Sequence, residues 1–361
     1  MSTSHTPPTP EQIQAGVEVM LSGVRGLPDH IGQGFTLAAG AAARVRRGDE
    51  GWRPRRVTLC ALGGSAFPGD LLWIALRDHG VALTVCRDYE PPADLDADDL
   101  VVVSSFSGNT EEALAALDLS CASAARVAVI CAGGALEARA RARDLPLIRI
   151  TKPNPDFQPR AASGFFLGAL AALLEDLGLF LGGRARLAAV ASEARALNAD
   201  PALAAEAAAV AGALSGKIPV FYAPPPFASS VARVVKIKIN ENAKSPAFWN
   251  EVPELNHNEM VGYTRLHAPL VAVFLTTTQT TPRQQTRVAR TVETLRKHGV
   301  DTLEVPMRPA RDPLAAALAT LYLFDLVSCE LATLAGVDPN PVAMVEDFKA
   351  SLGPFVTTRE P

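Results

Sequence analysis

One stretch of the chain, residues 236–262, mixes acidic, amide and imidazole side chains with apolar ones. It reads K-I-K-I-N-E-N-A-K-S-P-A-F-W-N-E-V-P-E-L-N-H-N-E-M-V-G. Glu241 follows an apolar run, and His257 stands between two asparagines. This combination is typical of a partly buried site where an acid and an imidazole act on one ligand. The alternative is a solvated or capping helix-end carboxylate and a packed or surface histidine. The other acids of the stretch are interpreted as bystanders: Glu251, Glu254 and Glu259.

A second stretch, residues 101–114, reads V-V-V-S-S-F-S-G-N-T-E-E-A-L. A buried strand that runs into hydroxyl groups, a glycine and then a helix directs N–H groups toward a bound anion. The stretch contains neither G-K-[ST] nor G-x-G-x-x-G, so a sugar monophosphate fits it better than a nucleoside triphosphate or a dinucleotide. The alternative is an ordinary capped helix start. The donors would be Ser105, Ser107 and Thr110, with Gly108 allowing close approach. Gly64 and Ser65, at another predicted strand end, could face the same ligand.

Composition limits the class of protein. The chain has 361 residues, 48% of them apolar and 20% charged, and a net charge of −4 without a basic block. These values indicate a globular protein of about two domains and argue against nucleic-acid binding. The five cysteines form no C-x-x-C pair, so no metal site or disulfide framework is predicted. We find no signal pattern and no apolar run of about 18 residues, which favours the cytosol and excludes a membrane span.

The elements that must position these residues alternate between strand and helix patterns. Short apolar runs of strand length occupy residues 57–62, 81–85, 100–103, 127–130 and 147–150. Helical patterns lie between them, for example at 111–119 and 136–144. This alternation predicts a parallel sheet with helices on both faces. Strand patterns return at 218–223, 270–276 and 302–305, with a helix near 283–298, which predicts a second α/β unit and a possible duplication.

The predicted organisation has four parts. Residues 1–50 form an N-terminal helical extension, 51–155 a first domain, 156–215 linking helices and 216–361 a second domain with C-terminal helices. The fold class is therefore α/β, with two flavodoxin-like domains whose parallel sheets are flanked by helices. A helix over 314–335 is apolar nearly all round, so we expect it to be buried.

Taken together, the motifs resemble the bifunctional phosphoglucose/phosphomannose isomerases of archaea and bacteria, which are built from two sugar isomerase (SIS) domains. The resemblance extends from about residue 55 to the end of the chain. It rests on five motifs in the right order: G-G-S-A-F-P-G-D (63–70), S-F-S-G-N-T-E-E (105–112), N-E-N-A-K (240–244), P-E-L-N-H-N-E (253–259) and G-V-D-P-N-P-V (336–342).

The resemblance implies a role for each matching residue. Glu241 would be the base that moves a proton between C1 and C2 of the sugar. His257 and Lys349 would help open the sugar ring, and Arg160 would stabilise the enediolate. Lys349 lies on a partly apolar helix face, which either turns it inward or lets it snorkel. The phosphate would be held by a set of hydroxyl side chains: Ser65, Ser105, Ser107 and Thr110.

Family members often have threonine where Asn340 stands, so Asn340 is a candidate for lining the space near C2. The implied activity is a cofactor-free aldose–ketose isomerisation. Glucose 6-phosphate or mannose 6-phosphate would be converted to fructose 6-phosphate through a cis-enediol.

The implied assembly is a homodimer in which His257 reaches the neighbouring active site. One alternative is a non-catalytic sugar-phosphate sensor. Another is an amidotransferring hexosamine synthase, which the lack of an N-terminal nucleophilic cysteine disfavours.

Overall fold

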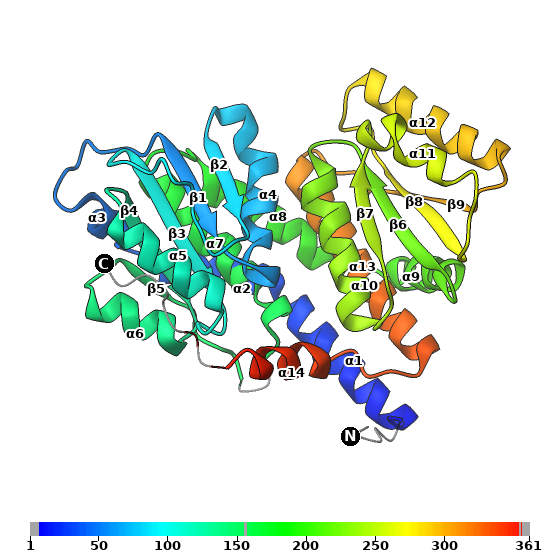
Figure 1. Cartoon of the computed structure of the whole chain (residues 1–361), viewed down its shortest axis with the longest axis horizontal. Helices are drawn as coiled ribbons and strands as arrows, with labels where there is room; N and C mark the ends of the chain where they lie inside the picture. The colour runs from blue at the N-terminus through cyan, green and yellow to red at the C-terminus, as the bar shows by residue number, and fades with distance from the viewer. Residues whose placement is uncertain (1–6, 155–156, 354, 356–361) are drawn as a thin grey trace. The chain divides into compact units, whose positions relative to one another are not determined.

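The computed structural model describes residues 7–154, 157–353 and 355. The chain divides into two compact units, each built around one sheet (Figure 1). The first-sheet unit comprises Gly26–Ser192 and the segment that begins at Val342. The second-sheet unit comprises the residues up to Arg25 and Glu193–Pro341.

The first sheet has five parallel strands, as the apolar runs predict. They are β1 (Arg56–Cys60), β2 (Ala82–Cys86), β3 (Asp99–Ser105), β4 (Arg126–Cys131) and β5 (Leu147–Arg149). Their order is β2-β1-β3-β4-β5. The order reverses between β1 and β3, and in open parallel sheets the crevice outside the carboxyl ends at such a reversal binds ligands. The loops after β1 and β3 are those with Gly64, Ser65 and the hydroxyl groups.

Helices cover both faces of this sheet, so β3 is buried along its whole length. On one face, valines of β3 and β4 pack against α5 (Glu111–Ala122) and α6 (Gly134–Ala142). The other face carries α7 (Ser163–Asp176), with α2 (Leu27–Leu37) packed against it (Figure 1). A Cβ at Gly168 would clash with the backbone of Ile31, so only glycine permits this close helix pair. The unit also contains α3 (Ala41–Arg46), α4 (Phe67–Leu76), α8 (Gly183–Leu197) and α14 (Ala343–Ser351).

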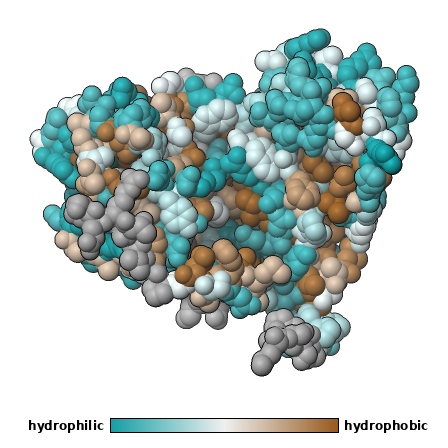
Figure 2. Space-filling view, viewed as in Figure 1, coloured by the Kyte–Doolittle hydropathy of each residue, from teal (hydrophilic) through white to brown (hydrophobic). Residues whose placement is uncertain are grey.

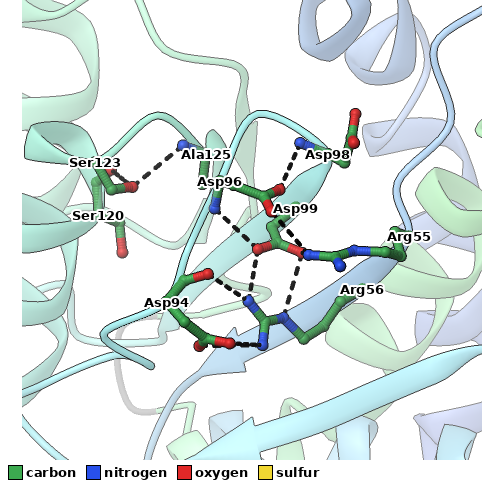
Figure 3. A network of polar contacts seen from close by, with 9 residues as sticks. All are labelled: Arg55, Arg56, Asp94, Asp96, Asp98, Asp99, Ser120, Ser123 and Ala125. Atoms are coloured by element: carbon green, nitrogen blue, oxygen red, sulfur yellow. Dashed lines mark hydrogen bonds and ion pairs between the residues drawn. The ribbon is translucent and has the colours of Figure 1, made fainter.

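The amino ends of the same strands carry a network of ion pairs (Figure 3). The Arg56 guanidinium donates to both carboxylate oxygens of Asp99, at 3.2 and 2.6 Å, and to Asp94 at 3.0 Å. Asp99 is fully buried and also accepts from the backbone N–H of Asp96 at 3.0 Å. The pKa of the Asp94 carboxyl is lowered by its hydrogen bond to Arg56. The network fixes the sheet at the end opposite to the polar loops.

The second sheet repeats this topology with four parallel strands. They are β6 (Ile218–Ala223), β7 (Phe248–Glu251), β8 (Leu270–Thr276) and β9 (Thr302–Pro306), in the order β7-β6-β8-β9. The order matches β2-β1-β3-β4, which supports the interpretation as a duplication. The sequence pattern did not predict β7. Its segment F-W-N-E is short and only partly buried at the sheet edge, so it lacks an apolar strand pattern.

The helices of the second-sheet unit surround one long helix, α13 (Pro313–Ala335). It contacts α1 (Pro10–Arg25), α9 (Pro201–Leu214) and α10 (Arg233–Asn242). By length and composition α13 could cross a membrane, although Asp325 and Glu330 interrupt its apolar run. However, 83% of its most apolar window is buried within the protein, as expected for a core helix. The unit also contains α11 (Glu259–Gly262) and α12 (Pro282–Lys297).

The alanine-rich region 185–214 forms two helices, α8 and α9. The first ends at Leu197, and Asp200 caps α9, because its side chain accepts a hydrogen bond from the Ala202 N–H at 3.0 Å. Pro201 then occupies the start of α9, where its missing N–H costs nothing. Helices α7 and α8 lie largely in the first-sheet unit and α9 in the second-sheet unit. The predicted domain boundaries at residues 50, 155 and 215 stay predictions.

Candidate functional site

The loop between β3 and α5 holds its hydroxyl groups together. The Ser105 and Thr110 hydroxyl oxygens are 2.9 Å apart, and the backbone N–H of Gly108 donates to Ser105 Oγ at 3.1 Å. The N–H of Asn109 donates to Ser107 Oγ at 3.2 Å. Thr110 stands at the N-cap of α5, yet its side chain makes no capping hydrogen bond. The hydroxyl groups therefore do not serve as the ordinary helix cap that was the alternative interpretation.

The first turn of α6 fixes the backbone of this loop. The N–H of Leu136 donates to the carbonyl of Gly108 at 2.8 Å, and the N–H of Ala135 donates to Asn109 Oδ1 at 2.9 Å. Gly108 has a φ of 69°, and a Cβ there would clash with the carbonyl oxygen of Gly133. Only glycine suits both constraints. A loop held in this way loses little conformational entropy when it binds an anion.

Two further segments meet this loop within the first-sheet unit. Ser65 ends a short 3₁₀ turn, Gly63–Ser65, and its buried hydroxyl accepts a hydrogen bond from the Phe106 N–H at 3.0 Å. A Cβ at Gly64 would lie 3.3 Å from the Cα of Arg160, in the turn Pro159–Ala161. The turns that carry Ser65 and Arg160 therefore lie against each other. Ser65 links its turn to the hydroxyl loop at the reversal of strand order.

Lys349 belongs to the same unit but lies on α14, where none of the described residues is buried. Its ammonium group pairs with Glu346 at 2.7 Å, and its side chain is 60% exposed. The inward orientation is therefore not observed. Apolar side chains of α14 are exposed as well, among them Met344 and Phe348, and Figure 2 shows apolar surface over this helix.

Glu241 lies at the end of α10, half-buried, and the asparagines on either side of it anchor that helix end. Asn240 Nδ2 donates to the carbonyl of Ser245 at 2.8 Å, and Asn242 Nδ2 donates to Ser328 Oγ on α13 at 2.9 Å. Asn242 is fully buried. The N-E-N pattern thus has a structural reason, because the two amides hold the turn that carries the carboxylate.

His257 is exposed at the end of the 3₁₀ turn Glu254–His257. Asn256 Nδ2 joins this turn to Thr291 Oγ1 on α12 at 2.9 Å. Immediately after the turn, Glu259 accepts hydrogen bonds from the Tyr222 hydroxyl and from Asn250 Nδ2, the latter at 2.5 Å. Glu259 therefore has structural partners, and its interpretation as a bystander to the chemistry stays a prediction.

The sequence carried a signal for this contact, because a tyrosine within the apolar strand β6 needs a partner for its hydroxyl. Tyr222 is fully buried, and its hydroxyl oxygen lies 2.7 Å from that of Tyr263. Burial raises the pKa of Tyr222 above its usual range and that of Tyr263 to about 12. Both phenols therefore stay neutral hydrogen-bond donors near neutral pH.

Asn340 follows α13 and connects it to α1 within the second-sheet unit. Its Nδ2 donates to the carbonyl of Gly16 at 2.7 Å, and its backbone N–H donates to Asp338 Oδ1 at 2.9 Å. A Cβ at Gly16 would clash with the Asp338 carboxylate, so a larger residue there would displace this side chain. The side-chain amide thus has a structural partner, and the expected role near C2 stays a prediction.

The predicted site residues divide between the two units. The first-sheet unit brings one group together: Gly64, Ser65, Ser105, Ser107, Thr110 and Arg160. It also carries Lys349, on α14. The second-sheet unit carries Glu241, His257 and Asn340, each held by asparagine or aspartate contacts of its own segment.

Comparison with known proteins identifies the family. Residues 203–352 match the family model of the bacterial phospho-glucose isomerase C-terminal SIS domain. The chain is 32% identical over 344 residues to a bifunctional phosphoglucose/phosphomannose isomerase of Caldicellulosiruptor bescii, covering 92% of this chain and 98% of that protein. It is 31% identical over 307 residues to the protein of that name from Aquifex aeolicus, covering 82% and 90%.

A solved structure shows the same fold. A hypothetical protein from Thermus thermophilus superimposes with a TM-score of 0.70 at 18% identity, covering 94% of this chain and 93% of the other. The sheet order and the hydroxyl loop are consistent with the family that these relatives indicate. The chain therefore belongs to the bifunctional phosphoglucose/phosphomannose isomerase family.

Proposed function

We propose that this protein is an isomerase that interconverts glucose 6-phosphate and mannose 6-phosphate with fructose 6-phosphate. The observation that carries the proposal is the hydroxyl loop, in which Ser105, Thr110 and the linked Ser65 lie at the reversal of strand order. Family membership supports the reaction class. Hydroxyl donors to a phosphate dianion are hydrogen bonds to a charged group, each worth about 1.5–3 kcal/mol.

Within this proposal the phosphate anchors one end of an open-chain sugar. The Glu241 carboxylate removes the proton from C2 of the aldose, which gives a cis-enediol, and returns the proton to C1 to give the ketose. Glucose and mannose 6-phosphate differ only at C2, so both give the same enediol. Arg160 supplies positive charge to the oxyanion that develops at O1 or O2. Asn340 is proposed to line the space near C2 and to influence the preference between the two epimers.

Ring opening requires its own proton transfer. A proton must leave the anomeric hydroxyl while the ring oxygen is protonated, and an imidazole or an ammonium group can do this near neutral pH. We assign these steps to His257 and Lys349. No step in this scheme draws on a cofactor or a metal.

The proposed assembly is a homodimer with shared active sites. The exposure of His257 supports it, as do the exposed apolar side chains on α14, which a soluble monomer rarely presents. A cytosolic location stays a prediction.

Incubation of the protein with fructose 6-phosphate, coupled to detection of glucose 6-phosphate, tests the function. A non-catalytic sensor would bind the sugar without forming product and would need neither Glu241 nor His257. Turnover that Glu241→Gln abolishes supports the isomerase. Tight binding without turnover would favour the sensor.

A further inference from the structure

The second-sheet unit contains a cavity of about 490 Å³ that the proposed reaction does not use. This volume lies within the range of about 300–1,000 Å³ that is typical of small-molecule sites. The cavity is formed by residues that follow three strands and by one face of α12. Its lining includes Pro224 after β6, Thr276–Thr280 after β8, Pro306–Ala310 after β9, and Gln285, Val288 and Ala289 on α12.

The position of the cavity follows the rule for ligand sites in parallel sheets. The order β7-β6-β8-β9 reverses between β6 and β8, and the cavity lies outside the carboxyl ends of both strands. Strand β8 takes the place that β3 has in the first sheet. The segment after β8, T-T-T-Q-T-T (276–281), therefore corresponds to the hydroxyl loop after β3. In both loops a backbone N–H donates to the hydroxyl two residues earlier, here Gln279 to Thr277 Oγ1 at 3.1 Å.

Contacts to the neighbouring segments hold this threonine loop in place. Gln285 Nε2 donates to the carbonyl oxygens of Thr280 and Thr278, at 2.8 and 3.2 Å. Gln279 Nε2 donates to the carbonyl of Ala310. The loop is thus joined both to α12 and to the segment after β9. The cavity is preformed, which reduces the entropic cost of binding.

Polar atoms beside the cavity lack partners among the described residues. Gln279 Oε1, Thr280 Oγ1 and Arg308 Nε are buried, and none of the three has a hydrogen-bond partner in that part of the chain. An unsatisfied buried polar atom costs about 1–3 kcal/mol, which a bound ligand and its ordered waters can recover. The set supplies an acceptor, a hydroxyl and a cationic donor. Arg308 also pairs with Glu206 at 2.6 Å, which fixes the guanidinium.

These groups match the chemistry of a phosphorylated sugar. The amide oxygen can accept from a sugar hydroxyl, while the threonine hydroxyl and the guanidinium can donate to a phosphate. Val288, Pro306 and Pro309 offer apolar surface for the C–H face of a hexose ring. The acidic side chain of the lining, Glu304, pairs with Arg296 at 3.0 Å, which offsets its charge.

We propose that this cavity is a second hexose phosphate-binding site, separate from the substrate site. The ligand class rests on the proposed function, whereas the existence of the site does not. The site binds the sugar without converting it, because Glu241 and His257 are not among its lining residues.

Calorimetric titration of the full chain with glucose 6-phosphate tests the proposal. The Glu241→Gln background prevents turnover during the titration. We expect two binding events per chain, of which Thr110→Val weakens one. Ala289→Leu places a larger side chain on the α12 face of the cavity and should remove the other. Ala209→Leu, at an exposed position of α9 outside the cavity, is the matched control and should keep both events.

Thr280→Val provides a second variant that keeps the side-chain shape. If the hydroxyl has no ligand, valine should be neutral or stabilising, since it removes an unsatisfied polar atom. If the hydroxyl binds the sugar phosphate, the second event should weaken by about tenfold. Thermal unfolding of each variant separates loss of binding from loss of folding.

Three outcomes would overturn the proposal. They are a single binding event in the parent protein, a second event that survives both Ala289→Leu and Thr280→Val, and equal binding of unphosphorylated glucose at this site. Two binding events in a protein without isomerase activity would instead leave the second site standing and refute the proposed function.

Discussion

The hydroxyl oxygen of Ser65 accepts a hydrogen bond from the backbone N–H of Phe106 at 3.0 Å. This contact links the loop after β1 to the loop after β3, across the reversal of strand order. Both partners are buried, so loss of the bond would leave a buried N–H without its partner. Ser65 therefore has a structural role in addition to its proposed contact with the phosphate.

Ser65→Ala should lower stability and weaken substrate binding together. The N–H of Phe106 would be left without a partner, at a cost of about 1–3 kcal/mol. Chemical denaturation and steady-state kinetics measure the two effects. Ser123→Ala is the control, because Ser123 makes similar turn hydrogen bonds, to Ser120 and Ala125, at the amino end of the sheet. Ser123→Ala should lower the free energy of unfolding without raising KM. A raised KM in this control would show that loss of stability alone weakens substrate binding, and not the loss of the Ser65 contact.

Glu241→Gln should lower kcat by at least about 10² while KM changes little. The amide keeps the size of the side chain but cannot take the C2 proton. Glu254→Gln is the matched control, since Glu254 is exposed and its carboxylate accepts from Asn258 at 2.7 Å. Near-normal turnover of the Glu241 variant would remove this residue from the mechanism.

Tyr222→Phe should slow reactions that require ring opening more than the proton transfer itself. The variant removes a hydrogen bond to Glu259, which holds the segment after His257. An open-chain aldose phosphate that cannot cyclise, such as erythrose 4-phosphate, reports C2 proton exchange alone. We expect that exchange to be preserved while kcat on glucose 6-phosphate falls by about tenfold. Equal losses in both assays would indicate general destabilisation instead of a positioning role.

The sequence predicted the parts of this protein that depend on local pattern. Strands such as β3 and β8 are continuous apolar runs, and the hydroxyl groups that follow β3 stand together in the chain. The edge strand β7 was missed because its residues are only partly buried. The partners of Glu259 could not be predicted from spacing, because Tyr222 lies far from it in the sequence. Nor does any local pattern show that α1 belongs with the second sheet and α14 with the first.

Stability should fall as the pH drops from 6.5 to 4, through His30. This side chain is buried and stacks on Phe165, with ring centroids 4.1 Å apart. Burial lowers its pKa from 6.5 to about 4. Between these values the unfolded chain binds a proton that the folded chain does not. The contribution of neutral His30 to stability is therefore complete above pH 6.5 and is lost progressively as the pH falls toward 4.

The expected loss from His30 is about 2 kcal/mol in the free energy of unfolding. Denaturant titrations at pH 7 and pH 4.5 measure it. His30→Gln is the comparison, because it cannot be protonated in this range. If the difference in unfolding free energy between the two pH values is the same in both proteins, His30 is not the group responsible.

A mixture of inactive subunits should recover activity if the dimer shares its sites. Suppose that each site takes Glu241 from one subunit and His257 from the other. A dimer of one Glu241→Gln and one His257→Ala subunit then has one site with both defects and one intact site. Random exchange makes half of the dimers mixed, so about a quarter of all sites should be active.

The control for this exchange experiment mixes Glu241→Gln with the double variant Glu241→Gln/His257→Ala. No pairing in that mixture restores Glu241, so its activity should stay at the level of Glu241→Gln alone. Exchange itself must be shown separately, for example by native mass spectrometry of subunits that differ in mass. If mixed dimers form and no activity returns, Glu241 and His257 of the same subunit act together, and the shared site is excluded.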